Sequence, residues 1–319
     1  MSSARFKGLA MSCAEAPVVI AVLTYLRPAR LQALLPVLVR QAAEAPCRTR
    51  VLVVDNDPEA SARSIVDSPE FGPVGYICEP RPGIGAARSR ALREARGARL
   101  LAFIDDDEIP SAGWLRSLLE THRRTEAAAV VGPVVSEFAA KPEEWIVSGG
   151  FFVRRRLPTG TEVSVAATNN LLIDLEQIAR LGVDFDSRFG LTGGEDTLFT
   201  RQIVQRGGKI VWCDEALVTD LVPEDRSTRK WVLQRAFSSG NTWSQVSLEL
   251  AGGGYKRLEG HCRLMGAGCV RSVGGALRFA FGLATSSVAD KAKGLRTLAR
   301  GAGMITGVFG YSYQEYGRG

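Results

Sequence analysis

Several common signatures are absent from this sequence of 319 residues. Its six cysteines include no C-x-x-C pair and no regular spacing, which favours scattered thiols of a reducing compartment over a disulfide scaffold. The apolar patch after Arg5 and Lys7 is too short for a secretory signal, and the C-terminal apolar blocks fall well short of the roughly 20 uncharged residues of a membrane-spanning helix. We therefore expect a cytoplasmic protein with residues 1–16 as a flexible leader.

The sequence also lacks a helix-turn-helix pattern, zinc-ligand spacing and an interleaved basic and aromatic strand, so nucleic acid is not an expected partner. A charged fraction of 23% and a hydrophobic fraction of 45% exclude a disordered or fibrous chain. The net charge of +6 is unevenly distributed, because residues 226–319 hold 14 Lys and Arg against 4 Asp and Glu. An anionic membrane surface is the better candidate partner for this basic third.

Three apolar, β-branched segments are present, at residues 18–23, 50–54 and 100–104, and each ends in polar side chains. Such continuous apolar segments are typical of strands buried on both faces of a parallel sheet. We expect an α/β fold with a doubly wound sheet, whose ligands bind outside the carboxyl ends of the strands. The expected crevice is lined by Asp55, Arg88 and residues 105–107.

Two further segments predict regular structure. Residues 29–43 carry leucines at helical spacing, and Pro36 should kink that helix. Residues 128–135 predict one more apolar strand.

Acidic and amide pairs supply the candidate chemistry, and each has two interpretations. The four consecutive acids at residues 105–108 either bind a divalent cation, which would offset their mutual repulsion, or form a solvated acidic turn. Glu195 and Asp196 follow two glycines, so they either supply a general base or cap a helix N-terminus. Asn169 and Asn170 precede an apolar segment and either cap a turn or bind sugar hydroxyls.

Taken together, these motifs resemble those of the inverting, nucleotide-sugar-dependent glycosyltransferases of family 2, of the bacterial exopolysaccharide or succinoglycan type. The resemblance covers roughly residues 17–240. It implies the GT-A fold, a doubly wound, mostly parallel sheet flanked by helices, with a C-terminal helical appendix in this chain. The matching motifs are Leu23 to Pro28, Val53 to Asn56, Gly83 to Ser89, the D-x-D at Asp105 and Asp107, and Glu195-Asp196.

The resemblance also implies roles for individual residues. A Mg²⁺ or Mn²⁺ ion would stabilise the diphosphate leaving group as a Lewis acid. Its implied ligands are Asp107, Asp105 and Asp220, the last standing where many relatives have histidine. The residues implied to bind the nucleotide sugar are Thr24, Tyr25, Arg27, Asp55, Asn56, Arg88, Asp105 and Asp106. Asp196 is the implied base, and the implied acceptor-binding residues are Glu195, Asn169 and Trp114.

The expected reaction moves one sugar, most readily from a UDP-sugar, to a saccharide or lipid-linked acceptor in cell-surface polysaccharide synthesis. Single transfer is expected because the chain lacks the Q-x-x-R-W motif of processive synthases. Two alternatives remain open. A metal-dependent nucleotidyltransferase or phosphohydrolase would also use clustered aspartates, and a non-catalytic relative would bind carbohydrate only.

Residues 241–319 form the expected C-terminal appendix. Basic residues flank or interrupt their two short apolar blocks, which predicts amphipathic helices lying on the inner face of the cell membrane. The alternative is a helical pair packed on the catalytic domain.

Overall fold

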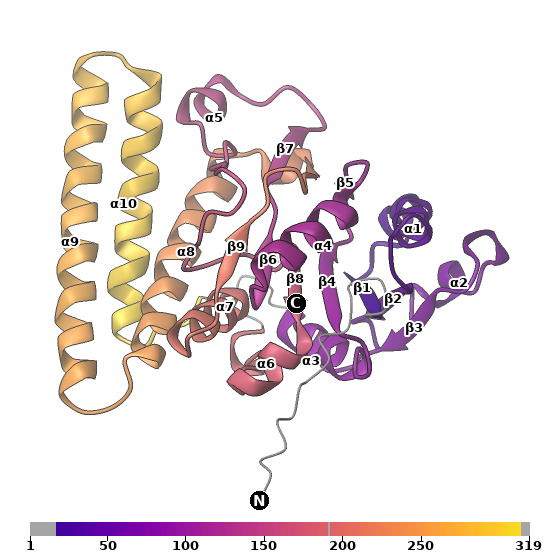
Figure 1. Ribbon diagram of the computed structural model, residues 1–319. Coiled ribbons are helices and arrows are strands. Elements are labelled where there is room, and N and C mark those ends of the chain that lie inside the picture. Colours follow the sequence, from indigo (N-terminus) through magenta and orange to yellow (C-terminus); the bar gives the residue numbers. More distant parts are fainter. Residues whose placement is uncertain (1–16, 191, 314–319) are drawn as a thin grey trace, which may run out of the picture.

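The computed structural model describes residues 17–190 and 192–313, so the expected leader at residues 1–16 lies outside the described residues. Its centre is a seven-stranded sheet with strand order β3-β2-β1-β4-β8-β6-β9 (Figure 1). β8 runs antiparallel to β4 and β6, and the other neighbours are parallel, which confirms a mostly parallel sheet. The strands are β1 (Val18–Thr24), β2 (Thr49–Asp55), β3 (Gly75–Cys78), β4 (Leu100–Asp105), β6 (Ala129–Val131), β8 (Asn170–Asp174) and β9 (Ile210–Trp212).

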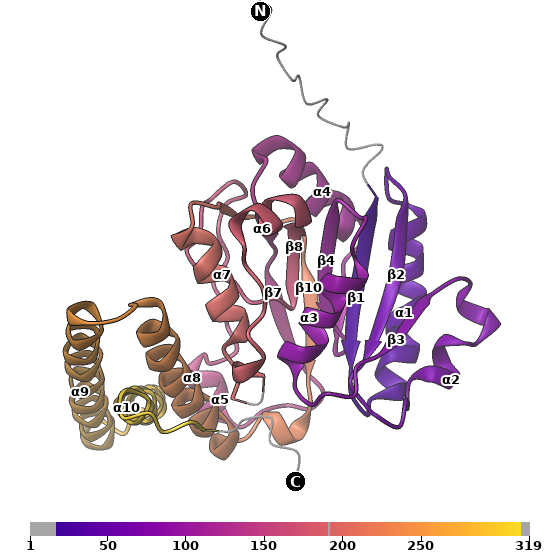
Figure 2. The ribbon, with the colours of Figure 1, turned by 90° about the horizontal axis from the view of Figure 1, so that it is seen from below.

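Helices cover both faces of this sheet (Figure 2). Side chains alternate along a strand, so Val18, Ile20 and Val22 of β1 enter one core while the residues between them enter the other. The first core lies under α1 (Pro28–Ala43) and α4 (Trp114–Thr125). The second lies under α3 (Ile84–Glu94), α6 (Leu175–Leu181) and α7 (Glu195–Gln205). Helix α1 forms over the predicted segment and includes Pro36, and a kink at that residue stays a prediction.

A second, three-stranded sheet corrects one prediction. Residues 128–135 are two strands rather than one, since β6 ends at Val131 and β7 (Val134–Phe138) joins β5 (Glu108–Pro110) and β10 (Val218–Val222). The break falls at Gly132, where an added Cβ would lie 2.1 Å from the carbonyl oxygen of Ala216. Pro133 follows it and has no N–H for a ladder. The chain therefore changes sheets at a point of close backbone approach.

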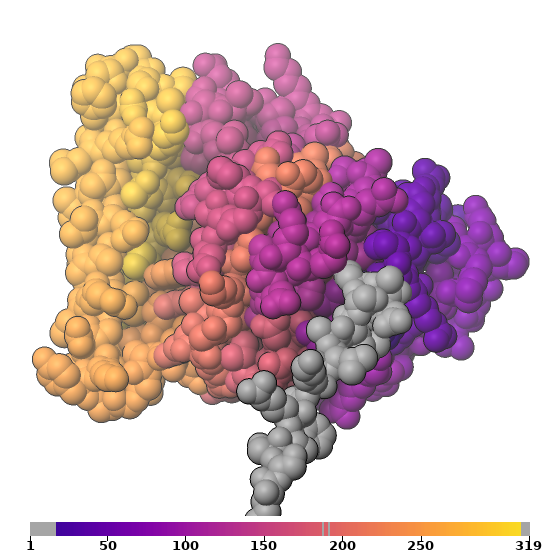
Figure 3. All heavy atoms as spheres, in the orientation of Figure 1, coloured from indigo at the N-terminus to yellow at the C-terminus, as the bar shows by residue number. Residues whose placement is uncertain are grey.

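Three long helices form the C-terminal region, which appears as a layer at one side of the molecule (Figure 3). They are α8 (Arg229–Leu250), α9 (Tyr255–Ala284) and α10 (Val288–Val308). Helix α10 lies between α8 and α9, so only one of the two predicted apolar blocks, that on α9, is on the outermost helix (Figures 1 and 2). The expected division at residue 240 falls inside α8. No helix within the described ranges is long and apolar enough to cross a membrane.

The remaining helical segments are short. Helix α5 packs through Trp145 and Ile146 against Ala292 of α10. The short helical segments are α2 (Arg63–Val66), α5 (Glu144–Gly149), and the 3₁₀ turns η1 (Pro69–Phe71), η2 (Ser187–Phe189) and η3 (Glu224–Arg226).

Candidate active site

The polar ends of β1, β2 and β4 meet at one edge of the sheet. Thr24 is in register with Asp55 on β2, and the preceding Leu23 is in register with Asp105 on β4. Because all three strands run parallel, their carboxyl ends emerge together. The hydroxyl of Thr24 and the carboxyl groups of Asp55 and Asp105 therefore lie at the ends of neighbouring strands, as expected for the predicted crevice.

Asp106 and Asp107 converge on arginine. Arg27 Nη1 donates to Asp106 Oδ1 at 2.8 Å and to Asp107 Oδ2 at 3.0 Å, and Thr24 Oγ1 donates to Asp106 Oδ2 at 2.8 Å. Burial raises the pKa of the Asp106 carboxyl, and the charge of Arg27 opposes that rise. The predicted nucleotide-site residues Thr24, Arg27 and Asp106 are thus brought together. They lie beside Asp107, which is predicted to ligate the metal ion.

Two further arginines contact Asp107, and neither was predicted from the sequence to belong to the site. Arg30 Nη1 lies 3.3 Å from Asp107 Oδ2, and Arg226 Nη1 donates to the same oxygen at 3.1 Å. Arg30 lies one helical turn beyond Arg27, so i,i+3 spacing could have indicated it. Arg226 lies in η3, which follows the β10 strand that carries Asp220. The place of Arg226 shortly after a strand that carries a predicted site residue is the sequence signal that could have indicated it.

A buried ion pair links β4 to α7. Arg88 on α3 donates through Nη1 to Glu195 Oε1, and its Nη2 lies 3.7 Å from Asp105 Oδ1. Burial raises the pKa of Glu195 to about 7 and that of Asp105 to about 6, while Arg88 opposes both shifts. Glu195 Oε2 is buried and has no hydrogen-bond partner among the described residues. Arg88 therefore connects the D-x-D motif to the Glu195-Asp196 pair.

Glu108 and Asp220 form a second acidic pair across neighbouring strands. They are opposite each other in the antiparallel β5–β10 register. Asn169 Nδ2 donates to Glu108 Oε1, and Arg154 Nη2 donates to Asp220 Oδ2 at 2.9 Å. Burial is the main cause that raises the pKa of both acids, and Asp107 raises both further. Asp220, a predicted metal ligand, thus lies within the electrostatic reach of Asp107.

Asp196 occupies the first turn of α7, directly after Glu195. Its Oδ1 accepts hydrogen bonds from the backbone N–H of Thr197 at 2.6 Å and from the Thr197 hydroxyl at 3.2 Å. Within residues 17–190 and 192–313, no hydrogen bond reaches Asp196 Oδ2. One carboxylate oxygen is therefore fixed to the first turn of the helix, and a base role for the other stays a prediction.

Asp55 and Asn56 organise loops in this structure. The fully buried Asp55 accepts hydrogen bonds from Ala62 N at 2.9 Å and from the Tyr76 hydroxyl at 3.0 Å. Asn56 donates to two carbonyls of the loop after β3 and accepts from Gly83 N at 3.1 Å. These bonds shape the turn into α3, and nucleobase contact by either residue stays a prediction. Tyr25 follows β1 and is exposed.

Trp114 corrects the predicted acceptor site. Its side chain is fully buried in the core, and its indole N–H donates to Asn170 Oδ1 at 2.8 Å. The same Asn170 donates to the carbonyls of Pro133 and Ala216, so its role is structural. An acceptor has no access to Trp114. The i,i+4 spacing of Trp114 and Leu118 on an apolar helix face is the signal that indicated a core position.

Comparisons with known proteins fit this geometry. Residues 19–178, half of the chain, match the family described as Glycosyl transferase family 2. The chain is also 38% identical, over 73% of its length and 76% of the relative's, to succinoglycan biosynthesis protein ExoM of Rhizobium meliloti (strain 1021). This chain belongs to glycosyl transferase family 2. The glycosyltransferase assignment made from the sequence motifs is thereby confirmed.

Two further matches extend the family comparison. The glucosyl-dolichyl phosphate glucuronosyltransferase of Haloferax volcanii is 26% identical over 60% of this chain and 64% of that enzyme. The mannosyltransferase PcManGT from Pyrobaculum calidifontis, solved with GDP-Man and Mn²⁺, matches with a TM-score of 0.59 and 16% identity, over 90% of this chain and 86% of its own. At that identity the structural match shows the fold, which confirms GT-A.

The carboxylates of the site fit a divalent cation by their chemistry. No cluster of three His, Cys, Asp or Glu side chains with metal-binding geometry is present in the part of the chain that the structure describes. Mg²⁺ in phosphate-transfer sites is commonly held by one or two carboxylates together with substrate phosphates, so a protein cage is not required. Asp105 at the end of β4 and Asp107 in the turn after it supply two hard oxygen donors, and the raised pKa of Asp105 reflects burial and crowding that a nearby cation would relieve.

Proposed function

We propose that this enzyme transfers a sugar, with inversion, from a nucleoside diphosphate donor to a lipid-linked saccharide precursor of a cell-surface polysaccharide. The observation that carries the proposal is the arrangement of two groups of acids linked by Arg88. Asp106 and Asp107 gather arginines at the strand ends, and Arg88 joins Asp105 to Glu195, the neighbour of Asp196. This connection between the strand ends and the start of α7 supports a donor site beside a base at Asp196.

Each group has a chemical role in this reaction. Asp105 and Asp107, with Asp220 nearby, would hold Mg²⁺ or Mn²⁺, which supplies Lewis-acid stabilisation of the diphosphate leaving group. Arg27, Arg30 and Arg226 place three guanidinium groups at Asp107, where they can also donate to phosphate oxygens. Asp196 accepts the proton of the acceptor hydroxyl through Oδ2, and Asn169 and Glu195 orient that acceptor.

The nature of the acceptor is inferred from relatives. ExoM is by name a succinoglycan biosynthesis protein, and the Haloferax volcanii enzyme by name acts on glucosyl-dolichyl phosphate. These names support a polysaccharide precursor and a lipid carrier, respectively. The predicted UDP-sugar stays part of the proposal, with a GDP-sugar as the alternative that the structural neighbour suggests.

A panel of UDP- and GDP-sugars, each with Mg²⁺ or Mn²⁺, tests the proposal. Binding to the folded state raises the unfolding temperature by mass action, so the true donor should stabilise the protein and should be consumed when acceptor is added. Asp107→Asn should lose the stabilisation. A nucleotidyltransferase or phosphohydrolase would instead process nucleotides without sugar transfer, and a non-catalytic relative would bind without turnover.

We further propose that α9 places the enzyme on the inner face of an anionic membrane. Val270, Val273, Leu277 and Phe281 recur at i,i+3 and i,i+4 spacing on the outermost helix, and each is 60–72% exposed. Arg271 lies beside this stripe. Apolar side chains flanked by basic ones match the charge and polarity of an anionic bilayer surface. Loss of sedimentation with phosphatidylglycerol vesicles in Leu277→Ser/Phe281→Ser is expected, and unchanged sedimentation would contradict it.

A further inference from the structure

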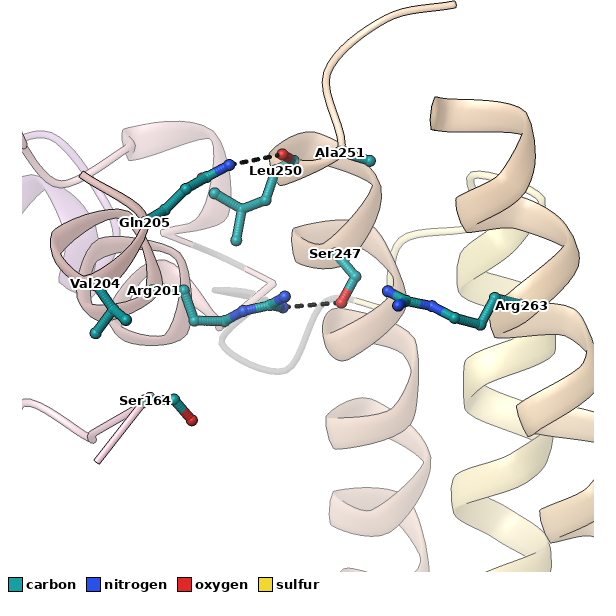
Figure 4. A pocket seen from close by; sticks show the side chains of 8 residues that line it. All are labelled: Ser164, Arg201, Val204, Gln205, Ser247, Leu250, Ala251 and Arg263. Carbon is teal, nitrogen blue, oxygen red and sulfur yellow. Dashed lines mark hydrogen bonds between the residues drawn. The ribbon is translucent and has the colours of Figure 1, made fainter. Parts of the chain in front are cut away.

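A surface pocket of about 340 Å³ lies where α7, α8 and α9 meet, and none of its lining residues belongs to the candidate active site. Two arginines from different helices, Arg201 on α7 and Arg263 on α9, extend toward each other across it (Figure 4). Ser164, Ser247, Val204 and Leu250 also line the pocket, and Leu250 lies between α7 and α8 (Figure 4). The pocket volume is at the low end of the range for small-molecule sites, roughly 300–1,000 Å³.

Arg201 is held in a fixed orientation. Its Nη1 donates to Ser247 Oγ at 2.8 Å, and its guanidinium carbon lies 4.7 Å from the centroid of the Trp243 ring. A stacked and hydrogen-bonded guanidinium loses little additional rotamer freedom when it binds a ligand. One half of a cationic site is therefore already formed.

Neither guanidinium has an acidic partner. Among the residues that the structure describes, no Asp or Glu lies within ion-pair distance of Arg201 or Arg263. The pKa of Arg201 is lowered, first by burial and then by the charge of Arg263. Arg201 is half-buried and Arg263 is exposed, and an anion between their guanidinium groups would offset the repulsion of the two like charges.

We propose that this pocket binds a phosphate ester. Arg201 and Arg263 hold the phosphate from two sides, and the Ser247 hydroxyl, which lies between them in Figure 4, adds a hydrogen bond. Leu250 contacts the organic part of the ester. The ligand reaches the pocket either as a soluble ester or as the headgroup of an anionic lipid, since α9 contributes both Arg263 and the exposed apolar stripe.

The test uses Trp243 as a local reporter. The full chain is labelled with 5-fluorotryptophan, the Trp243 signal is assigned from Trp243→Phe, and inorganic phosphate or glycerol 3-phosphate is titrated at constant ionic strength. The Trp243 signal should shift and saturate. Phosphate binding at the candidate active site would move other signals, because Trp243 packs on Arg201.

Matched variants separate a built site from general positive charge. Arg263→Gln should raise the dissociation constant by about tenfold or more, as expected for loss of a charge-assisted hydrogen bond. Lys256→Gln removes one positive charge from an exposed position of the same helix, outside the pocket and the apolar stripe, and should leave the dissociation constant unchanged. Equal weakening by both variants would overturn the proposal, as would a Trp243 signal that responds to no phosphate compound and no vesicle. Equal unfolding temperatures of the two variants show that neither disrupts the fold.

Vesicle sedimentation identifies the source of the phosphate. If Arg263→Gln reduces binding to phosphatidylglycerol vesicles more than Lys256→Gln does, the ligand is a lipid headgroup. If both bind vesicles equally while glycerol 3-phosphate still saturates the Trp243 signal, the ligand is a soluble ester.

Discussion

Asp196→Asn should separate donor binding from sugar transfer. The substitution keeps the size of the side chain, and the amide oxygen can still accept the hydrogen bonds that Thr197 gives to Oδ1. The change falls on Oδ2, which accepts no hydrogen bond from any described residue and becomes an NH₂ group. The variant therefore loses a proton acceptor while the start of α7 keeps its structure.

The expected magnitudes differ sharply for catalysis and stability. Loss of a general base typically lowers turnover by about 10²–10⁴-fold, equivalent to about 2.7–5.4 kcal/mol of activation free energy. Loss of one negative charge at a helix N-terminus costs only about 0.3–1 kcal/mol of folding free energy. Donor affinity should stay unchanged, because the donor contacts proposed at Asp105 and Asp107 are on other elements.

Single-turnover transfer and donor binding should be measured with the donor identified by the nucleotide-sugar panel. Asp225→Asn is the control, since Asp225 is an exposed acid in the first turn of η3 and the same chemical change there should leave turnover intact. Wild-type turnover of Asp196→Asn would refute the base assignment. A loss of donor binding equal to the loss of turnover would refute the separation of the two roles.

Three other substitutions test the site and its framework. Asp107→Asn should weaken donor binding that depends on Mn²⁺, read by calorimetry, and an unchanged Mn²⁺ requirement would contradict the metal role. Asp174→Asn should cost about 3–5 kcal/mol in urea unfolding, because this buried acid pairs with an arginine and with His122. Burial alone would raise the pKa of Asp174, but hydrogen bonds, first that from His122, hold it below its usual range. Its stabilisation is therefore full above its ordinary pKa and is lost as pH falls through the lowered value, so Asp174→Asn should show less acid sensitivity below about pH 4. Gly275→Leu should separate α9 from α10, since even a Cβ there would lie 2.5 Å from Leu298 N, and an unchanged unfolding temperature would contradict that packing.

The sheet was predictable from sequence because its evidence is local. Apolar, β-branched segments that end in acids require burial on two faces, and parallel strands bring those ends to one edge. The strand break at Gly132 was not predictable in the same way. It depends on the close approach of Ala216, which is far away in the sequence.

Side-chain partners in the site were harder to predict than backbone elements. Arg30 and Arg226 reach the same oxygen of Asp107 from α1 and from η3, and their long side chains leave no periodic pattern that fixes where they end. Trp114 shows the opposite case. Its i,i+4 spacing with Leu118 is typical of a core position, and the structure agrees with that spacing rather than with the acceptor contact that the family resemblance implied.

The acidic cluster shows why strand alternation fails beyond the end of a strand. Alternation predicts Asp105 and Asp107 on one side and Asp106 on the other. However, β4 ends at Asp105, so the next two residues follow the turn, and Asp106 and Asp107 share Arg27 while Asp105 faces Arg88. The grouping of the three aspartates therefore follows their arginine partners and not the alternation of side chains along the strand. Asp105 is therefore the acid that Arg88 connects to Glu195, in the first turn of α7 that also carries the proposed base.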